Sequence, residues 1–460
     1  ARTMKIILKE DSELLQEVVV VGYGTQKKAN LTGAVATVDV NKTLDSRPIA
    51  DIGRGLQGAV AGVNITIPTG EVGSDPLIKI RGQVGSISGN NTPLILLDNV
   101  EIPSIQMVNP NDVQSISVLK DAASSSIYGS KAAFGVILIT TKSGAQSDKF
   151  EISYSNNFSW QDPAKKIEIG GIEALQYTLD AQTNRREPMP AGGFWRISPE
   201  SLEKAIEWQN LYGGKVKWND PVVYGRDWFY DGKDKYGYRL YDGAKAMIKN
   251  WTPTMTHNLS VNGKSGKTSY NIGLGYLDQS GMSKTAKKDD FKRYNASVSV
   301  TSEINKYITV RASSIYSDRN KRYPGIGNTT ADPWLYLYRW SPLMPMGVTE
   351  NGNPLKEPTY EMAAANTDNL QNKYYNINLG FTLNLTKNWD VKFDYTYDRQ
   401  TTETNSSVMQ YEAGEMWYAP TAWMENGSQV FVNEQGERVD TGGMPAYRFP
   451  VNKYYNSSGP

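Results

Sequence analysis

The sequence predicts a mainly β fold in which a small mixed α/β domain precedes part of a transmembrane antiparallel β-barrel. Three observations favour a barrel over a soluble β-sandwich, whose strands also alternate. The alternating segments are roughly ten residues long, enough to span a bilayer when a strand is tilted. Tyrosine and tryptophan lie near the segment ends, and short connections alternate with long ones, as in outer-membrane barrels.

The composition limits the classes of protein that remain. Lys and Arg (49) balance Asp and Glu (48), so the net charge of +1 gives no basic surface for nucleic acid. The mean hydropathy of −0.51 and the lack of long apolar runs argue against transmembrane helices. Without cysteine, thiolate metal sites and disulfides are excluded. His257 is the only histidine, which argues against a catalytic triad or a zinc site and favours a residue of the barrel wall.

The chain begins with two short segments that differ from the rest. Residues 1–16 hold an apolar strand, Met4–Leu8, and a charged tether, as if the chain began at the tail of a preceding β domain. Residues 17–25 hold four consecutive valines followed by glycines. Because β-branched residues favour extended backbone, we expect an exposed strand there. A buried strand of the following domain is the alternative.

Residues 26–145 have the pattern of one compact α/β domain. Ile49, Ile52, Leu56 and Val60 recur at helical spacing, and several short apolar strands follow. Asp121 can cap a short helix that Gly129 ends. The sequence GRGLQG at 53–58 lacks the strand–turn–helix context of a dinucleotide site. Charged residues of this domain are expected to pair with the barrel wall: Arg81, Asp98, Lys120 and Asp121.

From residue 146 to residue 460 the hydrophobic period changes to two, which predicts barrel strands with long extracellular loops. Seven strands are expected: Phe150–Trp160, Met255–Asn262, Ser269–Leu277, Tyr294–Thr301, Tyr307–Tyr316, Tyr375–Thr386 and Trp389–Asp398. Seven strands would leave unpaired edges in lipid, so we expect further strands beyond residue 460.

The loops between these strands are rich in aromatic side chains that could stack on sugar rings or contact a covering protein. We single out eight of them: Trp195, Trp208, Trp218, Trp228, Trp334, Tyr336, Tyr338 and Trp340. Simple packing within a large loop is the alternative for each. A helix is expected to start at Pro199, capped by Ser198, with an apolar face of Leu202, Ala205 and Ile206.

The first long loop also contains three acidic residues that could hold calcium. Asp227, Asp231 and Asp234 offer oxygen ligands at short intervals, as calcium prefers. The spacing does not complete an EF-hand loop, and residues 231–234 can equally form a turn. No other cofactor is expected.

Five stretches of residues 17–160 resemble the SusC family of TonB-dependent outer-membrane transporters (SusC/RagA type). They are EVVVVGYG (17–24), PIADIGRGLQGAVAGV (48–63), IRG (80–82), PLILLDNV (93–100) and NPNDVQSISVLKDAASSSIYGSKAAFGVILITTKSG (109–144). Phe134 departs from the smaller polar residue usual there. The resemblance implies a plug domain inside a barrel of about 22 strands, of which roughly the first seven are present. Residues 1–16 resemble the end of the regulatory-like domain that precedes the plug.

The resemblance implies a multi-pass protein of the bacterial outer membrane that is not an enzyme. It would import a large nutrient, most simply an oligosaccharide, with oligopeptides as the alternative. A SusD-like surface lipoprotein would cover it, the inner-membrane TonB complex would energise it, and transporter–lid pairs would form dimers. The expected TonB box, held by strand addition, is Val18, Val19, Val20, Val21, Gly22, Tyr23 and Gly24.

Three other functions compete with import. A soluble carbohydrate-binding or adhesive protein would leave the plug-like block unexplained. A glycoside hydrolase needs two carboxylates across a sugar cleft, and no pair stands apart in the sequence. A signalling receptor is nearer, because such receptors carry an additional amino-terminal domain, and import and signalling could coexist.

Overall fold

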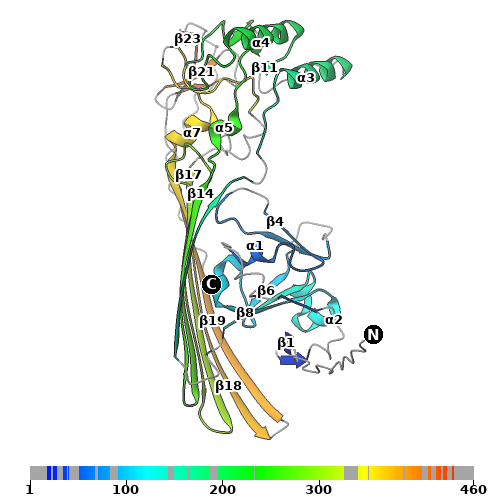
Figure 1. Ribbon diagram of the computed structural model, residues 1–460, viewed down its shortest axis with the longest axis vertical. Helices are drawn as coiled ribbons and strands as arrows, with labels where there is room; N and C mark the ends of the chain where they lie inside the picture. Colours follow the sequence, from blue (N-terminus) through cyan, green and yellow to red (C-terminus); the bar gives the residue numbers. More distant parts are fainter. Residues whose placement is uncertain are drawn as a thin grey trace, which may run out of the picture.

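The computed structural model describes a plug domain, part of a barrel wall and a group of loops above the wall (Figure 1). The described residues are 18–21, 24–27, 35–38, 40, 51–67, 71–82, 92–142, 144, 150–163, 166–185, 195–232, 234–325, 340–350, 352–386, 389–406, 413–415, 421–425, 428–432 and 438–439. Residues 1–16 and the predicted contact residues Trp334, Tyr336 and Tyr338 lie outside this set.

The plug is built around a five-stranded sheet with the strand order β3-β8-β9-β6-β7. Its strands are β3 (Val35–Val38), β8 (Val113–Leu119), β9 (Val136–Thr141), β6 (Leu94–Leu97) and β7 (Val100–Glu101). Only the β6–β9 pair is parallel; the remaining neighbours are antiparallel. A separate hairpin joins β4 (Val63–Thr66) to β5 (Leu77–Ile80).

Short helices complete the plug core. They are α1 (Ile52–Leu56), η3 (Ile105–Met107), η4 (Pro110–Asp112), α2 (Ala122–Ser125) and η5 (Ser126–Ala132). Ile52, Leu56 and Val60 are buried together, as their spacing predicted, although the helix covers little more than one turn. The predicted cap is confirmed, because the Asp121 carboxylate accepts a hydrogen bond from the backbone N–H of Ser124 at 2.8 Å.

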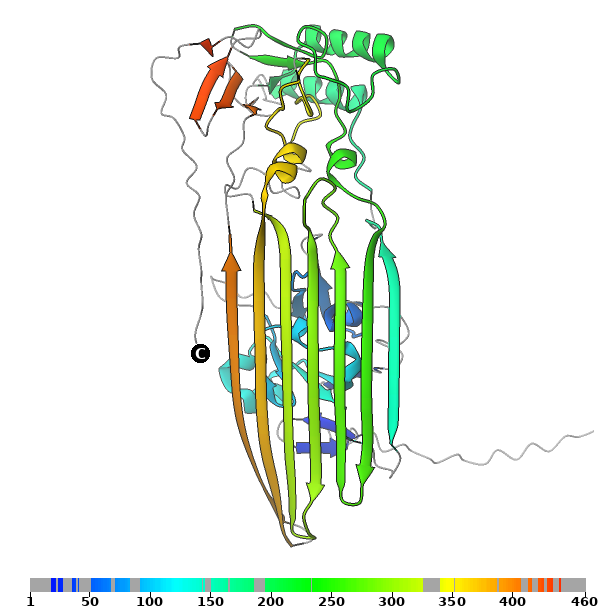
Figure 2. The same ribbon diagram turned by 90° about the vertical axis from the view of Figure 1, so that its left-hand side faces the viewer.

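The wall is one antiparallel sheet in which each strand pairs with the wall strand that follows it in the sequence (Figure 2). Its order is β10 (Glu151–Gln161), β14 (Thr252–Ser265), β15 (Thr268–Ser280), β16 (Asp290–Glu303), β17 (Ile308–Gly325), β18 (Asn366–Thr386) and β19 (Trp389–Asn405). All seven predicted strands are confirmed. Several extend further than predicted, because their outer ends are polar on both faces and carry no alternation.

The two faces of the wall differ, as a barrel requires. One face carries large apolar side chains that are roughly half exposed, such as Tyr154, Phe158, Leu379 and Phe393. His257 lies on this face, where its Nδ1 is 2.8 Å from the Tyr154 hydroxyl and its ring packs edge-on against Phe158. The plug lies against the opposite face (Figure 1). None of the described helices is long and apolar enough to cross a membrane.

The long loops gather at one end of the wall (Figures 1 and 2). They contain α3 (Ile172–Arg185), α4 (Pro199–Tyr212), α5 (Gly243–Met247) and α7 (Pro358–Ala364), with β11 (Trp195–Arg196), β12 (Trp228–Tyr230) and β13 (Lys235–Gly237). All of these elements except β13 contribute to one hydrophobic cluster, which we call the loop core. A four-stranded sheet follows, made of β20 (Gly414–Glu415), β21 (Thr421–Glu425), β22 (Ser428–Val432) and β23 (Arg438–Val439).

Candidate transport machinery

The valine-rich segment forms a hairpin outside the plug sheet. β1 (Val18–Val21) pairs antiparallel with β2 (Gly24–Lys27) in a two-stranded sheet of its own. The extended backbone agrees with the prediction, while Gly22 and Tyr23 lie outside the described residues. An isolated hairpin is marginally stable, and its outer edge offers main-chain groups to a further strand. The assignment as a TonB box stays a prediction.

The plug is bonded to the wall through residues 104–112, which we call the seat segment. Three inward-facing residues of β16 bond to it in succession. The Arg293 guanidinium donates to the Gln106 carbonyl at 3.0 Å, and the Asn295 amide donates to the Met107 carbonyl at 2.7 Å. The third contact runs from the Ser297 hydroxyl to the Asp112 carboxylate at 2.8 Å.

Neighbouring strands extend the same row of contacts. The Asn109 side-chain amide donates to Asn258 of β14 at 3.0 Å, and the Asn111 amide donates to Ser155 of β10 at 3.2 Å. On the other side, Arg319 of β17 donates to the Ser104 hydroxyl at 2.8 Å. The seat segment therefore reaches four strands of the wall.

Two glycines of β15 make room for this close approach. A Cβ atom at Gly273 would lie 2.5 Å from an Asp112 carboxylate oxygen, and one at Gly275 would lie 2.5 Å from the Asn109 amide nitrogen. At such distances a Cβ would push the Asp112 or Asn109 side chain away from its hydrogen-bond partner, so glycine at both positions allows the seat segment to bond where it does. Burial raises the pKa of Asp112, and the hydrogen bond from the Ser297 hydroxyl opposes this shift.

The charged residues that the sequence suggested as partners of the wall bond within the plug instead. Lys120 donates to the Ala61 carbonyl at 3.1 Å, Asp121 caps α2, and the Asp98 carboxylate accepts from the backbone N–H of Thr141 at 2.9 Å. Those three expectations are corrected: short-range partners within the plug satisfy these charges. Arg81 is exposed in a left-handed turn, with φ of 54°.

The seat segment and its partners in the wall were not predicted from the sequence. The sequence did contain a hint of these contacts. Arg293, Asn295 and Ser297 alternate with the apolar residues of the same strand, so they lie on its polar face. The pattern shows that they point into the lumen, but it does not show what they meet there.

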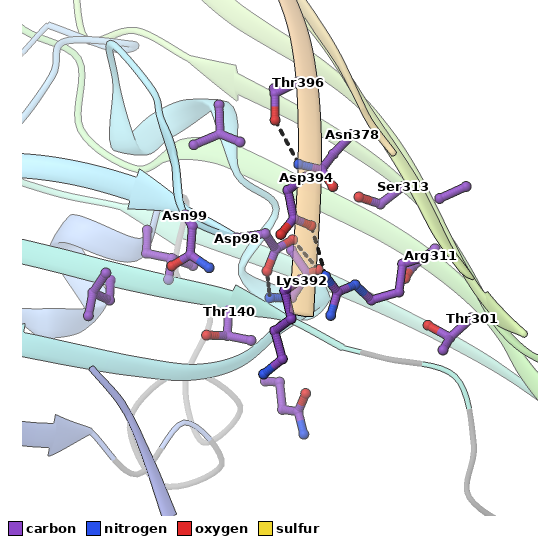
Figure 3. Close-up of a pocket in the computed structure, with 17 residues that line it drawn as sticks. Asp98, Asn99, Thr140, Thr301, Arg311, Ser313, Asn378, Lys392, Asp394 and Thr396 are labelled. Atoms are coloured by element: carbon purple, nitrogen blue, oxygen red, sulfur yellow. Dashed lines mark hydrogen bonds and ion pairs between the residues drawn. The ribbon is translucent and has the colours of Figure 1, made fainter. Parts of the chain in front are cut away.

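A cavity of about 750 Å³ separates another part of the plug from the wall (Figure 3). On the plug side it is lined by β9 and by the two-residue turn Asp98–Asn99, whose φ values of 47° and 69° fit a type I′ hairpin. On the wall side, Arg311 of β17 pairs with Asp394 of β19 at 2.8 Å. Gly380 of β18 lies between them, where a Cβ would be 2.4 Å from an Asp394 oxygen. This glycine therefore lets the ion pair cross an intervening strand.

Burial corrects the interpretation of four of the eight loop aromatics. Trp195, Trp208, Trp228 and Trp340 are at most 8% exposed. Three of them belong to the loop core, while Trp208 packs against Tyr212 and bonds to Asp227. Their burial favours the packing alternative over contact with a ligand or a lid, because covered rings cannot stack on another molecule. Trp218 is 53% exposed, so it remains available for contact.

The helix expected to start at Pro199 is confirmed with one change. Ser198 caps α4 by accepting a hydrogen bond from the backbone N–H of Ser201 at 3.0 Å. Leu202 and Ala205 are buried as predicted, but Ile206 is 40% exposed and Trp208 completes the buried face. Trp208 is covered because it lies three residues after Ala205, on the helix face that meets the buried Asp227.

Asp227 is an ionic centre of the loop core. Its carboxylate accepts from the Trp208 indole N–H at 2.9 Å and from the backbone N–H of Val223 at 3.0 Å. It also forms ion pairs with Arg226 at 2.8 Å and with the buried Arg239 at 3.4 Å. Burial alone would raise the pKa of Asp227, but the hydrogen bonds from Arg226, Val223 and Trp208 outweigh it and lower the pKa.

This arrangement disfavours the suggested calcium site. Protein donors already surround the oxygens of Asp227, and the Asp231 carboxylate accepts from the backbone N–H of Asp234 at 2.7 Å, as in a turn. Asp234 also pairs with Arg196 at 3.3 Å. Within the described ranges, no group of three or more His, Cys, Asp or Glu residues could hold a metal ion.

Known proteins resemble this chain both in the plug and over the longer stretch that includes the wall. The family model of the TonB-dependent Receptor Plug Domain matches residues 27–136. SusC of Bacteroides thetaiotaomicron, a TonB-dependent receptor, is 29% identical over 309 residues, which is 65% of this chain and 26% of SusC. The RagAB peptide importer in its open-open state superposes with a TM-score of 0.61 at 28% identity, over 85% of this chain and 43% of that chain.

The chain carries a TonB-dependent receptor plug and resembles the SusC-type transporters. TonB-dependent receptor P26 of Formosa agariphila agrees, at 29% identity over 79% of this chain and 33% of that relative. This SusC-type chain is thus a protein of the outer membrane, and its family consists of transporters rather than enzymes. It spans only about a quarter to a third of the curated relatives' length.

Proposed function

We propose that this SusC-type protein takes part in TonB-dependent import of a large nutrient across the outer membrane. One observation carries the proposal: the plug is seated by buried polar contacts, while a valine-rich hairpin stands outside its sheet. A plug bonded in this way blocks diffusion, so import needs a mechanical handle. Strand addition to residues 18–24 would supply one, because main-chain hydrogen bonds resist pulling along the strand.

We propose a SusD-like lipoprotein as the lid above the loop core, in dimers of transporter–lid pairs. The likeness to SusC and to RagAB supports such a partner. The exposed Trp218 offers an aromatic contact on the loops, with the Lys284 ammonium 5.7 Å from its ring centroid. Copurification of a lipoprotein with the full-length transporter tests this part.

We propose a large polar nutrient as the substrate, with an oligosaccharide and an oligopeptide as the two candidates. Burial of four loop tryptophans removes half of the eight aromatic side chains that favoured sugars. The solved neighbour RagAB is a peptide importer, which favours the second candidate. Mass spectrometry of compounds retained by the detergent-purified complex would separate the two classes.

Deletion of residues 18–24 tests the import mechanism directly. We expect the protein to reach the outer membrane and fold, as judged by its heat-modifiable mobility, while uptake falls to the level of a strain that lacks TonB. Normal uptake by the deletion variant would refute the assignment of the handle.

A substitution pair separates strand addition from side-chain recognition. Val20→Pro removes a backbone N–H within β1 and should abolish uptake, because proline cannot join a sheet ladder. Val20→Thr keeps both the N–H and the preference for extended backbone, so uptake should persist. Equal loss in both variants would indicate that the valine side chain itself is recognised.

A further inference from the structure

Besides an ion pair between Glu71 and Lys321 of β17, the plug meets the described wall in two contrasting ways. The seat segment is bonded to β10, β14, β16 and β17, whereas the cavity of about 750 Å³ separates the plug from the inner faces of β16 to β19. The cavity lies toward the short-turn ends of the strands, since Thr301 and Arg311 lie within three residues of the ends of β16 and β17.

Separating the seat segment from the wall would be costly. Gln106, Asp112, Arg293, Asn295 and Arg319 are each at most 8% exposed. Their hydrogen bonds join plug to wall, so movement of this segment would strand buried donors and acceptors on both sides. Several such contacts would have to break together.

The cavity face has no comparable attachment in the part of the chain that the structure describes. Its charged residues bond within their own unit: Asp98 to Thr141 in the plug, and Arg311 to Asp394 and Lys392 to Asp390 in the wall. Figure 3 shows Asp98 and Lys392 on facing elements, with the Arg311–Asp394 pair beside them. Widening this space would break none of those bonds.

We propose that the substrate passes the plug at this cavity, between the face formed by β9 and the Asp98–Asn99 turn and the wall strands β17 to β19, while the seat segment stays bonded. The inference rests on the proposed import function. The lining supplies hydrogen-bond donors, acceptors and both charge signs but no aromatic ring. Such a surface suits the brief passage of a polar, hydrogen-bonding solute, since it lacks the stacking faces that hold a ligand tightly.

Two cysteine pairs in the full-length transporter test this assignment. The 460 residues contain no cysteine, and any cysteine elsewhere in the protein would first be replaced by serine. The seat pair is Asn111→Cys with Ser155→Cys, whose parent side chains are hydrogen-bonded at 3.2 Å, and it is assayed once mass spectrometry shows that oxidation has joined the two thiols. The cavity pair is Thr140→Cys with Thr301→Cys, from the plug side and the wall side of the cavity, joined by a flexible bismaleimide.

We expect the uptake rate of the oxidised seat pair to stay within about twofold of the rate of its reduced form. The uptake rate of the tethered cavity pair should fall by about tenfold or more. Labelling the cavity pair with a monofunctional maleimide controls for the bulk of the reagent. The tether should reduce uptake at least about fivefold more than this monofunctional label does. The inference is overturned if locking the seat pair stops import, if the tether has no effect, or if the tether inhibits no more than the monofunctional reagent.

The same experiment distinguishes failure of the proposed import function from failure of the proposed passage. If the untreated variants and the parent protein show no TonB-dependent uptake, the proposed function fails and the assigned passage fails with it. If the untreated variants import normally and only the locking pattern differs from expectation, the import function stands and the passage lies elsewhere.

Discussion

Replacing Asp227 by asparagine should loosen the loop core, because this carboxylate balances two arginines. Arg239 is 2% exposed and lies 3.4 Å from Asp227. Its guanidinium also donates to the carbonyls of Lys217 and Trp218, at 2.8 and 2.9 Å. The ion pair therefore fixes the turn that presents the exposed Trp218.

The size of the effect follows from these contacts. Removing one partner of a buried ion pair costs about 3–5 kcal/mol. The loss should lie near the lower end, because Arg239 keeps its backbone acceptors and Arg226 remains partly exposed and solvated. A loss of about 3 kcal/mol corresponds to roughly a hundredfold larger population of the locally opened loop.

Hydrogen–deuterium exchange of the detergent-purified full-length protein measures this opening. Peptides that cover residues 213–245 should exchange roughly a hundredfold faster in Asp227→Asn, while wall peptides keep their rates. Glu203→Gln, on the exposed face of α4, is the matched control and should change little. A change below about threefold in Asp227→Asn would refute the view that this carboxylate holds the loop together.

Two further predictions concern the seat and a loop helix. Gly273→Leu should destabilise the seating of the plug by about 1–3 kcal/mol, which limited proteolysis would detect as faster cleavage of the plug. Gly171→Leu is the control and should leave the cleavage rate unchanged, because a Cβ at residue 171 meets no atom within 4 Å. Glu357 is the N-cap of α7, and burial raises its pKa from 4.5 to about 7. Burial outweighs the hydrogen bonds from Thr359 and Tyr360, which lower the pKa of Glu357. Its protonated form therefore favours the folded loop, and this stability is fully present below pH 4.5 and is lost as pH rises toward 7. Glu357→Gln should abolish that pH dependence of exchange over residues 355–365, and an unchanged dependence would exclude this carboxyl as its source.

Local patterns made most of the fold predictable. A strand that faces lipid on one side and the lumen on the other must alternate, so all seven wall strands could be read from neighbouring residues. The caps at Asp121 and Ser198 were predictable for the same reason, because each bonds to a backbone N–H three residues away.

The partners within the fold were less predictable. The sequence marked Asp98, Lys120 and Asp121 as plug charges that needed partners, but it could not show that the plug itself supplies them. It also grouped the loop tryptophans as one class. Folding divided them, because Trp195 packs into the loop core and Trp208 bonds to the buried Asp227, whereas Trp218 stays 53% exposed.

The sequence by itself determined the period of the wall, the positions of its turns and loops, the plug-type signature and the valine-rich strand, since each is written in residues close together along the chain. Only the tertiary structure decided how the plug is held. The bond from Ser297 to Asp112 joins residues 185 positions apart, and the Arg311–Asp394 pair crosses a strand that is open only because residue 380 is glycine. Such contacts depend on which inward side chains the folded sheet brings opposite the plug, and no local pattern contains that information.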